Sequence, residues 1–584
     1  MKVLLFRPLL VAAGILVACS DDPAQPPGPA PPAAAWDVYL ERFTGGPVSV
    51  SGTAADDLLV AAQDLLLHHD GTRWEPLPLP RSLAQVRGAW KTASGDLFLY
   101  DYRRVYRSND QFQDFISLPR DRVVCALPTG EIFVAGFDNH VHRYDGDTWS
   151  SDALPGEIRI DDLYARSASE AYAVGPYGTI ATFDGVSWAM VSLDSSRHFN
   201  EVWSRRPHVP LVVDSHGDVH EYEDGVLTRI QLASSFVGRE IWGSGNDAYI
   251  AGRDDNWNGW VQHSDGSGWV GTRLGTGSEV QSGWTAPTGE IFTVTYDGVW
   301  RTHGGNSERL LGVADPYRDW IYALWSCEDG VFAVGEGAYR FDGERWIDLG
   351  KQDLTDAPAV AVHGTNGQNV YAVGSRMILH YDGTSWDWVS DGLESPLFGI
   401  WVSERDGFAV GAYGSIVRSA GNSWEKMASP TSRTLLAVSG WEGGAVAVGE
   451  NGTIIRFDGD AWRDDESPVS WEILDVAAFG PARMVAVGDD PRSILVRDHR
   501  GWSVQEIETY LPHDYLFNYT TSVWGTSPSN LFVTQRVGDV HHFDGRTWTL
   551  LPRVVAGGAR DIAGTLDGDV FVASESAVVR YRPR

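Results

Sequence analysis

The 584-residue sequence predicts an all-β protein built from tandem four-stranded repeats that are arranged as β-propellers. Its 25 Trp, 64 Gly and 29 Pro favour strands and turns, because Gly and Pro weaken the interior of helices. A short motif, Asp-Gly-x-x-Trp, also recurs at intervals of about 40 residues, which leaves room for four short strands in each unit. We expect about 14 units in two seven-bladed discs, over residues 36–306 and 307–584.

The first segment, residues 1–18, is predicted to be a signal peptide that is removed. Lys2 and Arg7 give it a basic start, and the apolar run from Leu9 to Val17 follows. That run is too short to cross a bilayer as a permanent helix. The protein is therefore expected to be exported.

The sequence Leu16-Val17-Ala18-Cys19 resembles the lipobox of bacterial lipoproteins, in which the chain is cut before the Cys and the Cys is acylated. The resemblance implies a lipid anchor on Cys19, and an ordinary secretory signal with a chance Cys is the alternative. Residues 19–35 are rich in Pro and form the expected tether. Ser20, in place of an Asp, favours the outer membrane, facing the periplasm or the cell surface.

The net charge limits the kinds of partner that the protein can bind, and the cysteine content bears on whether it contains disulfides. The formal net charge of −32 disfavours nucleic acid and anionic lipid surfaces, which are bound through Lys and Arg. Cys125 and Cys327 are far apart in sequence and indicate no disulfide framework. We expect both to be small buried hydrophobic residues.

The repeat is clearest in residues 399–424 and 437–462. Each unit has an apolar strand, often ending in Trp-Gly, then an Ala-Val-Gly strand, and then a strand that ends in Tyr or Phe before Asp-Gly. Asp and Gly suit a tight turn, and the Trp offers a large apolar surface to a neighbouring blade. The intact motif ends at Trp74, Trp149, Trp188, Trp269, Trp346, Trp386, Trp462 and Trp548.

With these repeats, residues 36–584 resemble the WD40/YVTN/BNR-like propellers, and above all Trp-rich repeat lipoproteins of bacteria. The resemblance implies the fold and leaves the function open, because propellers serve as scaffolds, ligand-binding proteins and enzymes. The sialidase Asp-box has Asp-x-Gly where this chain has Asp-Gly, so the sialidase signature is not met.

The ends of the chain predict an exchange of strands between the discs. Val578–Tyr581 is a third strand with no fourth strand after it, whereas residues 36–40 look like a fourth strand with nothing before it. We expect residues 36–40 to pair with Val299–Thr302. Ser307–Leu311 would then be free to complete the last blade.

No catalytic, cofactor-binding or metal-binding motif stands out. Nucleophile elbows, phosphate loops and His-Glu-x-x-His are missing from the sequence. His140 and His142 have a spacing that a metal could use, although exposed strand residues are the simpler interpretation; His68-His69 and His541-His542 face opposite ways along a strand. The Asp of the repeated motif recurs in blade after blade, which indicates a structural role.

Two aromatic insertions, Asp254–Trp260 and Glu508–Tyr519, interrupt the repeat. Both lie in connections that reach the face of a propeller where ligands commonly bind, and insertions packed on their own blade are the alternative. The ligand-binding candidates are Trp257, Trp260, Tyr510, Tyr515 and Tyr519.

The function that we expect is a non-catalytic envelope propeller that binds a protein, peptide or glycan partner or acts as a scaffold. A propeller glycosidase or lyase acting on extracellular polysaccharide is one alternative. An assembly factor for an envelope complex is the other.

Overall fold

The computed structural model describes residues 36–583 with short gaps. Residues 1–35, with Cys19 and the tether, lie outside it. Within the described part, no helix is both long enough and apolar enough to span a bilayer. The internal gaps are residues 44–46, 81–82, 84, 93–94, 110, 118–121, 128, 137–138, 157–158, 193–195, 233–235, 245, 275–277, 313–319, 351–357, 391–392, 421–422, 508–517, 566 and 575–576.

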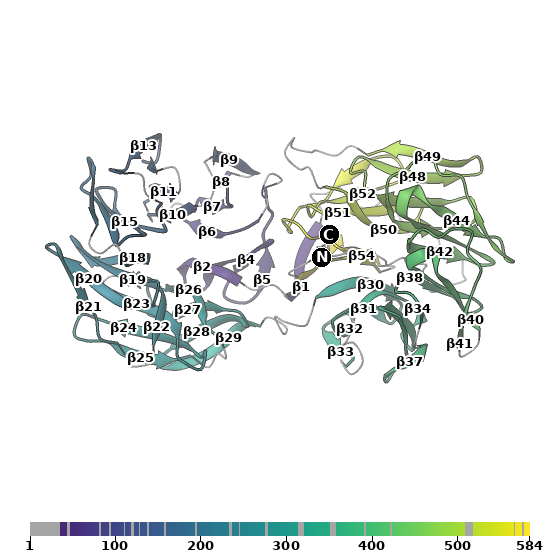
Figure 1. Cartoon of the computed structure of the whole chain (residues 1–584), viewed down its shortest axis with the longest axis horizontal. Helices are drawn as coiled ribbons and strands as arrows, with labels where there is room; N and C mark the ends of the chain where they lie inside the picture. The colour runs from purple at the N-terminus through teal and green to yellow at the C-terminus, as the bar shows by residue number, and fades with distance from the viewer. Residues whose placement is uncertain are drawn as a thin grey trace. The chain divides into compact units, whose positions relative to one another are not determined.

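Fourteen antiparallel four-stranded sheets account for the strands of the described residues, which confirms the all-β propeller prediction. They fall into two units, which we call the first ring (Gly45–Pro316) and the second ring (Tyr317–Arg584 together with the chain up to Thr44). Each ring holds seven sheets, set around a centre (Figure 1). In the first ring β2 (Pro47–Ala54) lies against β26 (Val280–Thr285), and in the second β30 (Ile321–Cys327) lies against β54 (Asp561–Gly564), so that each ring closes.

The remaining strands of the first ring run in chain order from the centre of each blade outward. They are β3 (Asp57–Ala62), β4 (Leu65–His69), β5 (Trp74–Pro76), β6 (Gly88–Lys91), β7 (Leu97–Tyr100), β8 (Arg104–Asn109), β9 (Gln111–Ser117), β10 (Arg122–Ala126), β11 (Ile132–Gly136), β12 (His140–Tyr144), β13 (Trp149–Ala153), β14 (Asp162–Ser167), β15 (Glu170–Gly175), β16 (Thr179–Phe183), β17 (Trp188–Ser192), β18 (Phe199–Arg206), β19 (Val209–Asp214), β20 (Val219–Glu223), β21 (Val226–Arg229), β22 (Val237–Ser244), β23 (Asp247–Arg253), β24 (Gly259–Ser264), β25 (Val270–Arg273), β27 (Ile291–Thr295), β28 (Gly298–His303) and β29 (Asn306–Gly312).

The second ring follows the same order except in its last blade, where β1 is the outermost strand beside β56, and two short 3-10 turns lie between second and third strands. Its other elements are β1 (Trp36–Phe43), β31 (Gly330–Gly335), β32 (Ala338–Phe341), β33 (Trp346–Asp348), β34 (Ala359–Asn366), β35 (Asn369–Gly374), β36 (Met377–Tyr381), β37 (Trp386–Ser390), β38 (Leu397–Val402), β39 (Gly407–Gly411), η2 (Ala412–Gly414), β40 (Ile416–Ala420), β41 (Ser423–Lys426), β42 (Leu435–Trp441), β43 (Gly444–Gly449), η3 (Glu450–Gly452), β44 (Ile454–Phe457), β45 (Trp462–Asp464), β46 (Ile473–Ala478), β47 (Met484–Gly488), β48 (Ser493–Asp498), β49 (Gly501–Glu506), β50 (Thr520–Ser527), β51 (Asn530–Gln535), β52 (Val540–Phe543), β53 (Trp548–Leu550), β55 (Val570–Ala573) and β56 (Ala577–Pro583).

The Asp-Gly-x-x-Trp motif forms the turn between the third and fourth strands. Asp382 Oδ1 accepts hydrogen bonds from the backbone N–H groups of Thr384 (2.8 Å) and Ser385 (2.9 Å), and Gly383 takes a φ of 95° that favours glycine. These donors, with the Thr384 hydroxyl first among them, lower the pKa of Asp382 to about 2. The repeated Asp is therefore part of the turn.

The Trp of the motif packs between blades, as the repeat predicts. The Trp462 ring lies 5.6 Å from Phe457 in its own blade and 5.2 Å from Phe408 in the preceding blade. Edge-to-face aromatic contacts of this kind add to the free energy gained from burying the rings. Trp462 therefore joins two sheets of the stack.

A second aromatic contact joins the innermost strands. A Cβ built on Gly440 in β42 would lie 2.7 Å from the Trp401 ring in β38, so only glycine allows the two strands this close. The same arrangement closes the first ring, where Trp284 of the last blade lies against Gly52 of the first. Trp and Gly on successive innermost strands therefore set the spacing of the blades.

The predicted strand exchange is wrong. β1 pairs with β56, with Val38 opposite Tyr581, and β29 pairs with β28, with Ser307 opposite Thr302. Only two glycines, Gly304 and Gly305, separate β28 from β29, so this hairpin closes with little loss of chain entropy. The chain's first strand is therefore left to complete the last blade of the second ring.

The two cysteines form no disulfide with each other. Burial raises the pKa of the Cys125 thiol to about 12, and its sulfur accepts a hydrogen bond from the Ala165 N–H (3.2 Å). A thiol with so high a pKa is a poor nucleophile.

Candidate functional site

The candidate site lies on one face of the first ring. Strand order places the turn between the second and third strands of every blade at the same end as the connection to the next blade. We call this end the turn face. Side chains at these turns are free to vary, because they do not pack between sheets.

Exposed aromatic side chains are concentrated on the turn face. Tyr102, Tyr177, Trp257 and Tyr296 occupy the corresponding turn in four blades and are 36%, 65%, 56% and 43% exposed. Among the described residues, they are the exposed large aromatic side chains of this ring. An exposed aromatic side chain at a turn offers a flat apolar surface to a partner.

Trp257 is held in place by the turn that carries it. The carboxylate of Asp254 accepts hydrogen bonds from the backbone N–H of Asn256 (2.9 Å) and from the Asn258 side chain (2.9 Å). Hydrogen bonds, above all from the Asn258 side chain, lower the pKa of Asp254 to about 2. Trp257 takes a φ of 63°, and the Arg253 guanidinium lies 3.9 Å from its ring centroid. The ring is thus presented to solvent with one side covered by a cation.

Tyr177 is fixed in a similar way. Its φ is 60°, and Gly178 beside it donates its N–H to the carbonyl of Arg197 (2.8 Å) in the connection to the next blade. Tyr102 lies under Arg87, whose guanidinium is 3.9 Å from the ring centroid. These aromatic side chains are therefore positioned before any partner arrives.

Three carboxyl groups lie on successive innermost strands of the first ring. Asp162 accepts a hydrogen bond from the backbone N–H of Val202 (2.8 Å) in the next blade, and Glu240 accepts one from Gly283 (3.3 Å) in the blade after its own. Desolvation raises the pKa of Asp162 to about 6 and of Glu240 to about 8, and it raises the pKa of Glu201 well above the usual range. Two of the three acids thus link neighbouring innermost strands.

The residues predicted from sequence are divided between the two rings. Trp260 lies in β24, half-buried, and donates its Nε1–H to Asp254 (3.2 Å), so it supports the turn that presents Trp257. Tyr519 lies in the second ring, where its hydroxyl oxygen accepts a hydrogen bond from Arg536 (3.0 Å). Tyr510 and Tyr515 lie outside the described residues.

Sequence reasoning missed three aromatic residues of the turn face, namely Tyr102, Tyr177 and Tyr296. The sequence signal for them is an aromatic residue at the turn position. In Gly175-Pro-Tyr-Gly178 a Tyr occupies the position that an Asn occupies in Gly449-Glu-Asn-Gly452. These turns have the same length as the turns of other repeats, so they do not appear as insertions in the sequence.

One His-carboxylate cluster has a spacing that could suit a metal. Ligand atoms of Asp214, Asp218 and His220 lie within 4.8 Å of one another. Arg197 Nη1 already lies 2.9 Å from Asp214 and 3.2 Å from His220 Nε2. A guanidinium therefore takes the place that a cation would need.

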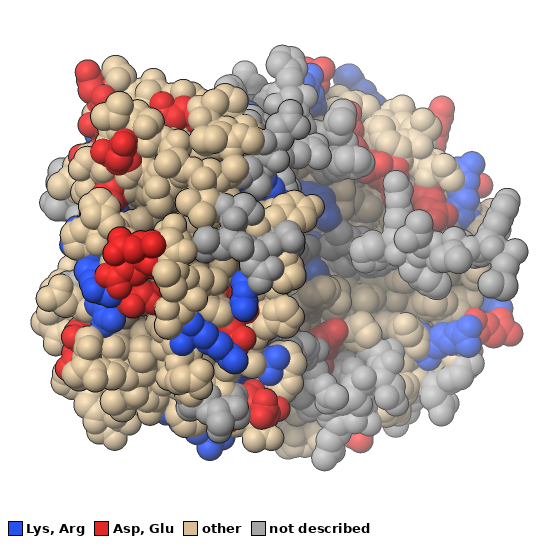
Figure 2. Space-filling view, turned by 60° about the vertical axis from the view of Figure 1, so that its left-hand side comes forward, with Lys and Arg blue, Asp and Glu red and all other residues tan. Residues whose placement is uncertain are grey.

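Charged side chains are interspersed on the face shown in Figure 2, where Lys and Arg form no continuous stripe among the described residues. An extended basic surface is what binding to a phosphate backbone requires.

No family model and no curated protein matches this sequence. In structure the chain is similar to PorZ, an essential bacterial surface component of the type-IX secretion system of Porphyromonas gingivalis, with a TM-score of 0.63 and 9% identity over 94% of this chain and 87% of that one. It also matches the extracellular domain of BT4673 from B. thetaiotaomicron, with a TM-score of 0.39 and 12% identity over 93% and 81%. At these identities the likeness concerns the fold, and the neighbours are surface or extracellular domains of bacterial envelope proteins.

Proposed function

We propose that this protein is a non-catalytic, lipid-anchored propeller of the cell envelope that binds a protein, peptide or glycan partner through the turn face of the first ring. Export and anchoring rest on the Leu16–Cys19 lipobox. The envelope location is in keeping with the surface and extracellular domains to which the fold is similar.

The observation that carries the proposal is the set of exposed aromatic side chains at equivalent turns. Flat rings can stack on sugar faces or on apolar side chains of a protein. Trp257 and Tyr177 sit on turns that backbone hydrogen bonds already hold, so little entropy is lost when a partner binds. Arginine beside Trp257 adds a polar contact at the edge of the ring.

The test compares Trp257→Ala and Tyr177→Ala with Tyr413→Ala in pull-downs from solubilised membranes and on a glycan array. Tyr413 is the matched control, because it has the same kind of turn (φ 58°) and is 78% exposed, but it lies in the second ring. We expect each test variant to bind the captured partner about five- to thirtyfold more weakly, with an unchanged thermal melt.

The proposal fails if both test variants bind as the wild type does, or if Tyr413→Ala loses as much affinity. A protein captured by the pull-down with no array signal would identify the partner as a protein, as the assembly-factor version requires. Array binding with no captured protein would identify a glycan.

A glycosidase or lyase is the second candidate, and the carboxyl groups of Asp162, Glu201 and Glu240 favour it. Hydrolysis of a glycosidic bond uses two carboxyl groups, one of which must hold a proton near neutral pH. If the chain released reducing sugar from envelope polysaccharide and Glu201→Gln abolished that release without altering the melt, the non-catalytic proposal would be wrong.

A further inference from the structure

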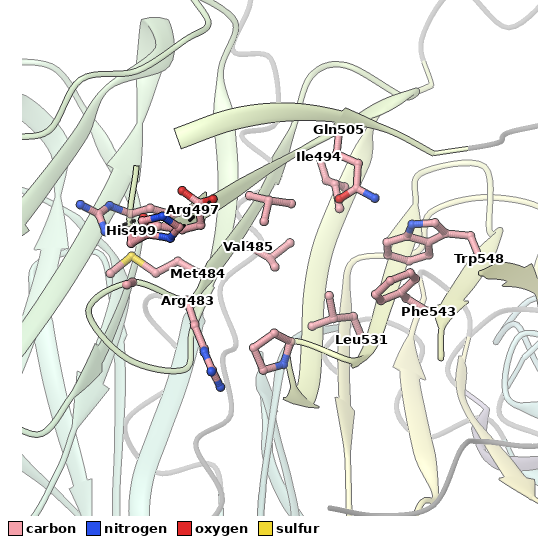
Figure 3. Close-up of a pocket in the computed structure, with 14 residues that line it drawn as sticks. Arg483, Met484, Val485, Ile494, Arg497, His499, Gln505, Leu531, Phe543 and Trp548 are labelled. Atoms are coloured by element: carbon pink, nitrogen blue, oxygen red, sulfur yellow. Dashed lines mark hydrogen bonds and ion pairs between the residues drawn. The ribbon is translucent and has the colours of Figure 1, made fainter. Parts of the chain in front are cut away.

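A cavity of about 470 Å³ lies in the second ring between the blade of β46–β49 and the blade of β50–β53 (Figure 3). Its volume falls within the range of small-molecule sites in proteins. Phe543 and Trp548 stand on one side of the gap, and Val485 and Ile494 stand on the other. Its lining also includes the polar residues Arg483, Arg497, Asp498, His499 and Gln505.

The cavity has a cause in the repeat. At several other interfaces an aromatic residue of the second strand fills this space: Phe408 contacts Phe457 (4.9 Å) and Trp462 (5.2 Å) of the next blade. At the interface that closes the ring, Phe571 of the second strand fills the space, with its ring centroid 5.5 Å from that of Phe341. In the blade of β46–β49 this position is Val485, so no ring lies between the sheet and Trp548.

A second departure from the repeat lies on the opposite face of the same sheet from Val485. The third strand of a blade usually ends in Phe or Tyr, as at Phe457, whereas β48 has Arg497 there. Arg497 donates from Nε to Asp465 (3.0 Å) and from Nη1 to the carbonyl of Pro481 (2.6 Å), and its side chain is only 11% exposed. Asp465 belongs to the preceding blade, so these bonds hold the guanidinium on the face of the sheet away from Val485.

The mouth of the cavity carries one arginine, Arg483, that has no ion pair among the described residues. Arg483 is exposed at the first turn of the blade, and His499 is 75% exposed beside Asp498. On a chain with a net charge of −32, an exposed arginine beside an apolar cavity favours an anionic ligand over a cationic one.

We infer that this cavity binds a carboxylic acid with an aromatic or branched apolar body, whose body lies against Phe543 and Trp548 and whose carboxylate faces Arg483. Such an acid can be a free small molecule or the C-terminal residue of a peptide. The site is in the second ring, so the inference does not depend on the turn face of the first ring.

The test uses the whole protein and measures binding by isothermal titration and ligand-observed NMR. The probes are N-acetyl-phenylalanine, its amide, and a pentapeptide ending in Phe with a free or an amidated C-terminus. We expect the acids to bind and the amides to bind at least tenfold more weakly, because the amide lacks the charge that Arg483 attracts. Preference for the free amino acid or for the peptide distinguishes the two sources.

Two variants address the two halves of the site. Val485→Phe restores the ring that Phe408 supplies elsewhere, and we expect it to abolish binding while the thermal melt stays the same or rises. Arg483→Gln changes an exposed residue and should weaken the acids about five- to tenfold without affecting the amides. Arg463→Gln, an exposed arginine of the preceding blade outside the cavity, is the control and should bind as the wild type does.

The inference is overturned if no probe binds the wild-type protein at about 1 mM. It is also overturned if acids and amides bind equally, or if Arg483→Gln binds the acids as well as Arg463→Gln does. The result for Arg483→Gln decides the matter even where Val485→Phe does not fold.

Discussion

The closure of the second ring predicts a dependence of stability on pH that one substitution should reduce. Ser522 Oγ lies 2.8 Å from Asp475 Oδ2 and 2.7 Å from Asp561 Oδ1, and all three residues are fully buried. A hydroxyl carries one hydrogen, so it can donate to only one of the two carboxyl groups. The other carboxyl must be protonated and donate to the Ser522 oxygen. Geometry thus requires at least one proton in this cluster.

The pKa of Asp561 sets the size of the effect. Desolvation raises it from an ordinary value of 3.8 to about 7, although the Leu324 N–H (2.6 Å) stabilises the charged form. A shift of about three pKa units corresponds to about 4 kcal/mol. Because the folded-state pKa is the higher one, this stability is fully present below pH 3.8 and is lost as the pH rises to about 7. The amide of Asp561→Asn resembles the protonated carboxyl group and does not titrate, so the variant should not lose this stability as the pH rises.

The assay is urea unfolding, followed by Trp fluorescence, at pH 5.5 and at pH 8, away from the isoelectric point near 4.8. About 2 kcal/mol of the Asp561 contribution is lost within that interval. We expect the unfolding free energy of Asp561→Asn, relative to wild type, to rise by that amount between the two pH values.

Asp458→Asn is the control for this experiment. Asp458 is exposed in an Asp-Gly turn, and hydrogen bonds, above all from the Ala461 N–H, lower its pKa, so it stays charged throughout the interval. Equal pH dependence in wild type and Asp561→Asn would refute the buried-proton argument. The argument would also be refuted if the unfolding free energy of Asp458→Asn, relative to wild type, rose by the same amount between pH 5.5 and pH 8.

Two further predictions concern the spacing of the blades and the membrane anchor. Gly440→Ala should destabilise the second ring by about 1–3 kcal/mol in urea unfolding, because the added Cβ meets the Trp401 ring, whereas Gly268→Ala, with open space around it, should change little; equal effects would contradict the close packing of Trp on Gly. Cys19→Ala should move the protein from the membrane fraction to the soluble fraction or leave an uncleaved precursor, and an unchanged membrane fraction that keeps its acyl label would contradict lipidation.

The sequence was sufficient to predict the blades, because the contacts that define them are local. Asp382 and the amides that it binds are two and three residues apart, and the Trp386 ring lies 5.3 Å from Tyr381 across the same turn. Local bonds of this kind form wherever the motif recurs, so the number of repeats could be read from the spacing of Trp.

The candidate site could be predicted only in part. Trp257 and Trp260 are three residues apart in one insertion, yet one is exposed and the other supports the turn. That difference depends on φ at Trp257 and on the hydrogen bonds of Asp254. Tyr177 lies in a turn of ordinary length, so its exposure becomes apparent only when the blade is folded.

The way in which distant segments meet depends on the tertiary structure. An unpaired strand such as β1 has no local preference between two open sheet edges, and the hairpin of β28 and β29 closes one of them first. The cavity beside Val485 also arises between blades, because Trp548 on its other side belongs to the next blade. The cluster around Ser522 is of the same kind, since Asp475 accepts a hydrogen bond from Val523, about 50 residues further along the chain. The repeats determine the structure of each blade, because the hydrogen bonds and ring contacts that form it join residues close in sequence. Ring closure, burial and pKa depend on residues from different blades, which meet only in the folded ring.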